Sequence, residues 1–352
     1  MHLISKTEPG KPSMLESLKF KVLEFHTSTT SNQNPTRSAQ TDRYTLRLAN
    51  ELQHIKRKRG TEGVLRAVLS SQSNDDDPYL EYLAQQFPTG EFENWARCQE
   101  LLPHIYVAYN SVPVTLKSWE AWAHIFTNVA WYLWKQGDCD IALIMITEAS
   151  VVRQTLFGCN DHRTLLATEI LAGVLSSRGN HHEAVELNRR ALKGFKKTLG
   201  SLHPFTLTSL SNLALALQRL GNFKQSEALS RLALRGSKIV LGSSHADTLI
   251  SMSNLALVLQ HQGKYKQATK LYQQALNGFQ ETLGKRHPFT LASMSNLGLV
   301  LQCQGRYTES QELHQQSLEG KVEELRWHHP STLTGMSNLA LALQHQSKCR
   351  SL

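Results

Sequence analysis

The chain has 352 residues, of which 40% are hydrophobic and 19% charged, and a formal net charge of +9 at pH 7. This composition excludes a collagen-like or wholly disordered chain, and no apolar run approaches the ~18 residues that span a bilayer. The five cysteines are odd in number and show no CxxC spacing, which disfavours a disulfide framework or a zinc site. With no apolar core in the opening MHLISKTEPGK, we expect a cytoplasmic protein with reduced thiols.

Residues 1–78 predict a divergent, partly disordered N-terminal region. Helices are expected over 13–25 and 43–58, and the linker 27–42 contains almost nothing to bury. The basic run KRKR at 56–59 fits either a nuclear-import or nucleic-acid patch or a solvated helix end, of which we favour the second. Residues 79–115 then predict a helical linker.

A repeat dominates residues 116–352. The strings SNLALALQ, SNLALVLQ, SNLGLVLQ and SNLALALQ place an anchor asparagine every 42 residues, at Asn212, Asn254, Asn296 and Asn338. Stepping back by the same interval reaches weaker copies at Ile170 and Asn128. In each unit, apolar residues recur at helical spacing on both sides of a glycine that suits a chain reversal. We therefore expect five helix pairs followed by one terminal first helix.

Three further positions in each unit hold only Ala, Gly or Ser, at 2, 14 and 21 residues after the anchor. After Asn254 they are Ala256, Ala268 and Ala275. Two antiparallel helices need small residues where their axes approach closely, so we expect these positions to be buried at helix crossings.

The pattern resembles the tetratricopeptide repeat, and its 42-residue period with LG, HP, TL and SNLA resembles the kinesin light chain subtype. The resemblance implies an all-α fold: a right-handed superhelical solenoid of antiparallel helix pairs. Upstream, YLEYLAQQFPTGEFENWARCQELLPHI at 79–105 and the aromatic-rich first repeat resemble the junction and array of fungal NB-ARC–TPR proteins, NLR-like ATPases of the STAND class. No GxxxxGK[ST] motif occurs, so we expect the sensor half of such a protein without its NTPase.

In this family the first helices line a concave groove, which makes the anchor face the expected partner-binding site. A serine precedes each anchor and a glutamine stands six residues after it, which provides uncharged donors and acceptors for the backbone of an extended peptide. The alternative is that the asparagines cap or brace the neighbouring repeat. The predicted site comprises Ser211, Asn212, Gln218, Ser253, Asn254, Gln260, Ser295, Asn296, Gln302, Asn338 and Gln344.

Catalytic and metal chemistry find no support in the sequence. His203, His245, His287 and His329 recur in register, but equivalent residues of successive repeats lie ~10 Å apart, too far to share one ion. We expect each to order its own interrepeat turn. No Ser/His/Asp or Cys/His arrangement stands out and no GxSxG occurs, so we expect no enzyme, no cofactor and no metal.

The predicted function is protein–protein interaction, by capture of a peptide or partner helix in the groove. One alternative is a kinesin-light-chain-like cargo adaptor, although the heptad coiled coil that would join it to a motor chain is missing. The other is binding of nucleic acid or an acidic partner by basic residues on the second helices, which we expect instead to form a solvated convex face. We also expect no membrane partner, and self-association through the C-terminal helix at 331–346, whose apolar face lacks a second helix.

Overall fold

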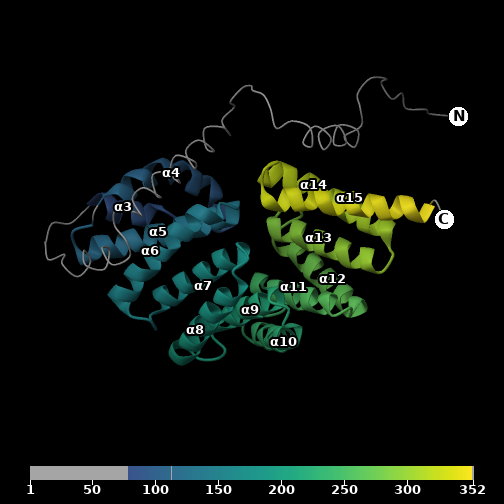
Figure 1. The fold of residues 1–352 in the computed structure, drawn as a ribbon, viewed down its shortest axis with the longest axis horizontal. Coiled ribbons are helices and arrows are strands. Elements are labelled where there is room, and N and C mark those ends of the chain that lie inside the picture. The colour runs from purple at the N-terminus through teal and green to yellow at the C-terminus, as the bar shows by residue number, and fades with distance from the viewer. Residues whose placement is uncertain (1–77, 112, 351–352) are drawn as a thin grey trace, which may run out of the picture. The chain divides into compact units, whose positions relative to one another are not determined.

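The computed structural model describes residues 78–111 and 113–350, all of which lie in one compact unit, Glu51–Leu352. The helices expected at 13–25 and 43–58, the linker 27–42 and the basic run 56–59 lie outside the described residues. Within the described ranges every regular element is a helix, and there is no strand. The predicted all-α class is therefore confirmed (Figure 1).

Ten of the helices form five consecutive antiparallel pairs, and one more first helix follows them. The pairs are α5 (Leu116–Gln136) with α6 (Cys139–Phe157), α7 (His162–Ser177) with α8 (His181–Leu199), α9 (Pro204–Arg219) with α10 (Phe223–Val240), α11 (Ala246–His261) with α12 (Tyr265–Thr282), and α13 (Pro288–Cys303) with α14 (Tyr307–Leu325). The last helix is α15 (Pro330–Arg350), and before the array come α3 (Pro78–Gln86), the 3₁₀ turn η1 (Phe92–Asn94) and α4 (Trp95–Asn110).

The His-Pro motif starts the first helices. At α13 the Nδ1 atom of His287 accepts a hydrogen bond from the backbone N–H of Phe289 at 3.2 Å. Pro288 takes the first helical position, where its missing N–H costs nothing. The Thr290 hydroxyl then donates to the carbonyl of Gly284 at 2.7 Å, which ties the new helix to the turn before it. The expectation that each histidine orders its own turn is confirmed at all four: His203, His245, His287 and His329.

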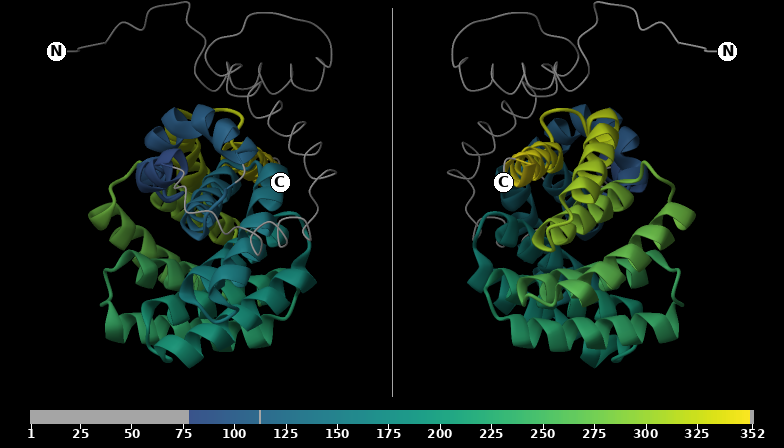
Figure 2. Two further views of the ribbon diagram at one scale, coloured as in Figure 1. Left: turned by 90° about the vertical axis from the view of Figure 1, so that its left-hand side faces the viewer. Right: turned by 90° about the vertical axis from the view of Figure 1, so that its right-hand side faces the viewer.

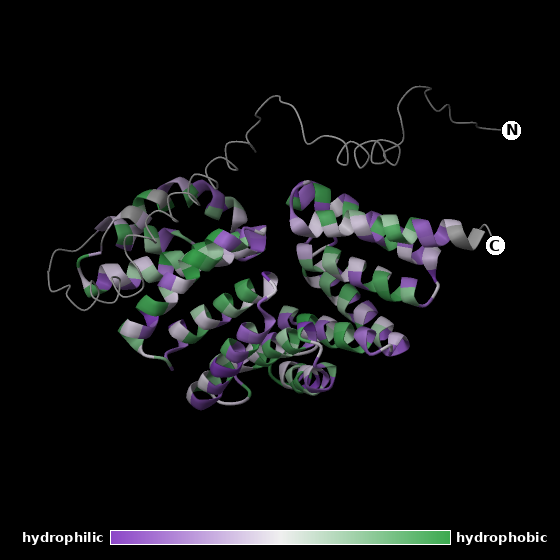
Figure 3. Ribbon diagram, viewed as in Figure 1, coloured by the Kyte–Doolittle hydropathy of each residue, from purple (hydrophilic) through white to green (hydrophobic). Residues whose placement is uncertain are grey.

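The small positions lie at the helix crossings, as the sequence predicts. All of them are buried from the first repeat to the fifth, including Ala256, Ala268 and Ala275 at 0% exposure. Ala340 differs, because it is exposed on α15 and the described chain supplies no second helix to cover it. In Figure 3 the helices of the array each carry both hydrophobic and hydrophilic residues.

The array curves until its first and last helices meet. The approach is confined to a few residues at the start of α4, the end of α5 and the start of α15, and Figure 2 views it from the two sides. The rings of Trp95 on α4 and His329 before α15 are 6.0 Å apart, and a Cβ on Gly137 would stand 2.5 Å from the Pro330 ring. Among the described helices, none combines the length and apolar character that crossing a membrane requires.

Candidate functional site

The anchor asparagines form a row on the first helices. Asn212, Asn254 and Asn296 are half-buried, whereas Asn338 and Asn128 are 9% and 6% exposed. Part of each side chain is thus covered by surrounding structure. The half-buried ones remain reachable from solvent, as a groove contact requires.

The serines and glutamines are less accessible than the asparagines. Ser211 and Gln218 are buried, and the Ser211 hydroxyl lies 3.3 Å from that of Ser251 in the next repeat. Ser295 is also buried, and it accepts a hydrogen bond from Lys321 Nζ at 2.8 Å. Of the remaining predicted residues, Ser253, Gln260 and Gln302 are half-buried and Gln344 is exposed. Ser211 and Ser295 therefore brace helices, and the role of the whole set in binding stays a prediction.

The connection between α3 and α4 lies against α5, and we call residues 87–95, which include the 3₁₀ turn η1, the inner segment. The Asn128 side-chain amide donates to the backbone carbonyl of Phe87 at 3.3 Å. Gly90 approaches the backbone of Tyr132 so closely that a Cβ there would clash, and its carbonyl accepts from Trp95 Nε1 at 3.1 Å. An anchor asparagine thus donates to a backbone carbonyl just after a helix end, here one belonging to the same chain.

Two of the capping histidines use their second nitrogen as well. Because Nδ1 of His287 and of His329 accepts a backbone N–H, the proton of the neutral ring belongs on Nε2. From there His287 donates to Glu93 Oε1 at 3.1 Å, and His329 donates to the carbonyl of Lys135 at 3.0 Å. The Phe92 ring packs edge-on against His287, with centroids 5.3 Å apart. The sequence predicts only the capping half of this arrangement.

Glu169 is a candidate site residue that the sequence reasoning missed. It stands 42 residues before Ser211 and so occupies the serine position of the weak second copy. Burial raises the pKa of its carboxyl to about 7, although hydrogen bonding from Ser209 and Asn212 opposes that rise. Its Oε1 atom is buried without a hydrogen-bond partner among the described residues. The only signal in the sequence was a carboxylate in the register of a serine.

The basic side chains predicted for the second helices do point to solvent. Some already have acidic neighbours, because Glu227 lies 2.6 Å from Arg231 and 3.1 Å from Lys264. Binding of nucleic acid or an acidic partner on this face stays a prediction. Among the described residues, no three His, Cys, Asp or Glu side chains gather into a metal-binding group. The exposed residues are Arg189, Arg190, Lys193, Lys196, Lys197, Lys224, Arg231, Arg235, Lys238, Lys264, Lys266 and Lys270.

A family model described as the tetratricopeptide repeat matches residues 163–239, 205–281, 247–321 and 293–351, together more than half of the chain. The chain belongs to the tetratricopeptide repeat family. No curated protein matches it. Its repeat unit of two helices, with a capping histidine before the first helix and a glycine in the turn between the helices, is 42 residues long.

Solved structures of repeat proteins resemble this one. NprR in complex with its cognate peptide NprX has 15% identity and a TM-score of 0.61, over 88% of this chain and 84% of that one. A Rap protein complexed with Competence and Sporulation Factor has 13% identity and a TM-score of 0.52, over 95% and 93%. A putative kinesin light chain from Podospora anserina has 26% identity and a TM-score of 0.45, over 57% and 95%. The first two show that the fold of the array is shared.

Proposed function

We propose that this tetratricopeptide repeat protein binds an extended segment of a partner protein along its anchor asparagines. The observation that carries the proposal is the hydrogen bond from Asn128 Nδ2 to the Phe87 carbonyl. It is the contact expected between an anchor amide and a peptide backbone. The same side chain recurs, half-buried, at Asn212, Asn254 and Asn296.

The spacing of the first helices suits an extended ligand. Neighbouring packed helices lie about 10 Å apart, and an extended chain advances about 3.3 Å per residue. One anchor amide would therefore meet about every third residue of a peptide. A backbone contact of this kind gives affinity, while the side chains around it give sequence preference. The inner segment already occupies α5, so the row from α9 to α13 is the part open to a partner.

The experiment selects peptides from a random display library on the full chain and measures their affinity by calorimetry. Each lost hydrogen bond typically costs about 1 kcal/mol. The variant Asn254→Ala/Asn296→Ala should then bind selected peptides roughly 30-fold more weakly, with unchanged helicity. Asn277→Ala, on the exposed side of α12, is the matched control. Selected peptides that bind the double variant as tightly as the wild type would contradict the proposal.

We further propose that the module is the sensor of an NLR-like signalling protein. Support comes from the sequence at 79–105 and from the way those residues fold, as α3, η1 and α4, against the first repeat. The alternative is a kinesin-light-chain-like cargo adaptor. A GxxxxGK[ST] motif in the reading frame that precedes this sequence would favour the sensor. A heptad coiled coil there would favour the adaptor.

We also propose that α15 mediates self-association. Leu333 and Leu341 are 45% and 46% exposed, and Ala340 is exposed beside them. In the preceding repeats the corresponding small residues, such as Ala256, are covered by a second helix. A surface of this composition is stabilised when another apolar surface covers it.

A further inference from the structure

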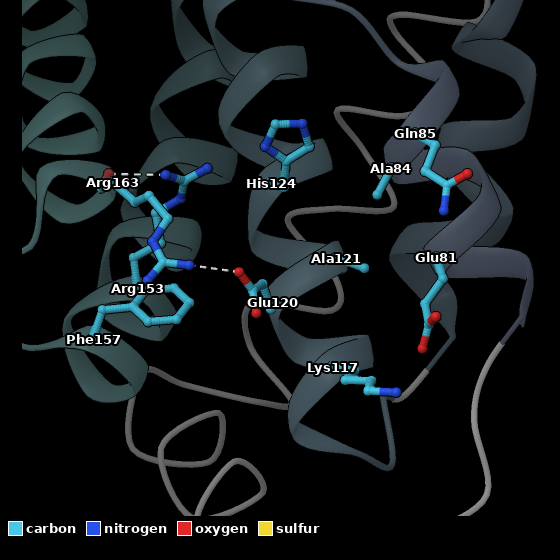
Figure 4. Close-up of a pocket in the computed structure, with 10 residues that line it drawn as sticks. All are labelled: Glu81, Ala84, Gln85, Lys117, Glu120, Ala121, His124, Arg153, Phe157 and Arg163. Carbon is cyan, nitrogen blue, oxygen red and sulfur yellow. Dashed lines mark hydrogen bonds and ion pairs between the residues drawn. The ribbon is translucent and has the colours of Figure 1, made fainter.

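A cavity of about 450 Å³ lies between α3, α5, α6 and the start of α7. It is lined by charged side chains from opposite sides, as Figure 4 shows. Arg153 and Arg163 line one wall, and Glu81 and Gln85 of α3 line the facing wall. This size lies within the range of small-molecule sites in proteins. The cavity is separate from the row of half-buried asparagines on α9, α11 and α13.

Arg163 has its charge fully compensated. Its guanidinium lies 2.6 Å from Glu120 Oε1 and 3.0 Å from Asp161 Oδ1. The guanidinium carbon also lies 3.4 Å from the centroid of the Phe157 ring. The geometry therefore leaves Arg163 little capacity for a ligand, and it acts as a wall of the cavity.

Arg153 is the opposite case, although it lines the same cavity. It is 5% exposed, and its one hydrogen bond to a described residue runs from Nη1 to the Arg163 carbonyl at 2.9 Å. Its Nε atom is buried with no partner in the described chain. A buried cation is costly unless a counter-charge and hydrogen bonds compensate it. Burial lowers the pKa of this guanidinium to about 10, a value at which it is still charged at neutral pH.

The facing wall holds an acidic side chain with an unpartnered atom. The Oε1 atom of Glu81 is buried and, in the described chain, has no hydrogen-bond partner. Between the two charged walls, Ala84, Ala121 and Phe157 provide apolar surface. The cavity thus offers the Arg153 guanidinium to an anionic group and the Glu81 oxygen to a cationic one, and Lys117 of α5 also lines it on the Glu81 side.

We propose that this cavity binds a small zwitterion, an apolar α-amino acid, whose carboxylate pairs with Arg153 and whose ammonium pairs with Glu81. The apolar side chain of the ligand then lies against Phe157 and the two alanines. Arginine suits the carboxylate because its planar fork binds both oxygens. Glu81 can accept the ammonium protons with the oxygen that otherwise has no partner.

The test uses the full chain and three probes of similar shape: L-leucine, 4-methylpentanoate, which lacks the ammonium, and isoamylamine, which lacks the carboxylate. Leucine should bind saturably in calorimetry and raise the melting temperature. The other two should each bind at least about tenfold more weakly, a loss of about 1.4 kcal/mol. Absence of saturable leucine binding at millimolar concentrations, or equal binding of 4-methylpentanoate, overturns the proposal.

Variants assign the two ends of the ligand. Arg153→Gln should abolish leucine binding, whereas Lys193→Gln, at an exposed position of α8, should not change it. Glu81→Gln should weaken leucine about tenfold but leave 4-methylpentanoate unaffected, so that the preference between the two probes disappears. If Arg153→Gln fails to fold, Ala121→Leu fills the cavity and should block leucine. Retained leucine binding in folded Glu81→Gln and Ala121→Leu proteins would refute the site.

Discussion

The Cδ2 atom of Leu249 on α11 lies 2.6 Å from the point at which a Cβ on Gly278 of α12 would stand. The leucine side chain thus fills the space that the glycine leaves within one helix pair. The contact repeats every 42 residues, with 2.5 Å for Leu165 over Gly194 and for Leu291 over Gly320. In the first repeat the two positions hold Ala123 and Val152, both buried, so the larger side chain has moved to the second helix.

This exchange of volume leads to the first prediction. Gly278→Ala should destabilise the protein by about 1–3 kcal/mol in urea unfolding, because a Cβ there overlaps Leu249. Gly278→Val with Leu249→Ala reproduces the first repeat and should recover part of the loss. Gln274→Ala, exposed on the same helix, should be neutral. A double variant less stable than the sum of its single changes would show that the two positions do not compensate.

The second prediction concerns Ala268, which is 0% exposed at a helix crossing. Ala268→Leu overpacks that crossing and should lower the free energy of unfolding by about 1–3 kcal/mol. Lys266→Leu introduces the same side chain at an exposed position of α12 and should change it by less than about 0.5 kcal/mol. Equal losses would mean that the register of α12 is wrong.

The third prediction concerns Arg326, whose φ of 69° is positive. It follows Leu325 where the other repeats have glycine, as at Gly284 with φ 89°. A side chain in this region costs about 1 kcal/mol, so Arg326→Gly should raise the free energy of unfolding by up to about that amount. Gly284→Arg should have the opposite effect. A lower melting temperature in Arg326→Gly would show that the positive φ of Arg326 does not destabilise the protein.

The fourth prediction follows from Glu169, because burial raises the pKa of its carboxyl from the ordinary 4.5 to about 7. Between pH 4.5 and about 7, Glu169 therefore keeps its proton in the folded state and has lost it in the unfolded state. The contribution of Glu169 to stability should be complete below about pH 4.5 and fall, by at most about 3 kcal/mol, as pH rises to 7. Glu169→Gln should remove this part of the slope in urea unfolding at several pH values. Glu186→Gln, exposed on α8, should leave the slope unchanged.

The fifth prediction tests the exposed face of α15. If it mediates self-association, sedimentation at high micromolar concentration should show dimers or larger species. Leu341→Glu should return the protein to the monomer, because a buried carboxylate in the contact is costly. Lys270→Glu, which changes charge on exposed α12, should have no such effect. A wild-type monomer under these conditions would exclude the proposed contact.

The accessibility of the anchor residues could be predicted only in part. The period of 42 predicts which helix carries each anchor, and in the structure Asn212, Asn254 and Asn296 are half-buried. It also turns Ser211 and Ser295 into the packed interior. Positions one residue apart on a helix are separated by about 100°, so a neighbour in sequence need not share a face. Nothing in the repeat indicated whether the serine or the asparagine that follows it would remain accessible.

The sequence by itself determined the helix pairs, their caps and their small crossing residues, because each repeat contacts mainly its neighbours. Its 42-residue period therefore contains most of the information for packing Ala268 or capping with His287. Only the tertiary structure decided that Glu93 meets His287 and that Lys135 meets His329, each across 194 residues. It likewise decided that Arg153 lies buried with its Nε atom unpartnered among the described residues. These contacts depend on small rotations summed over several repeats, and no single repeat encodes that sum.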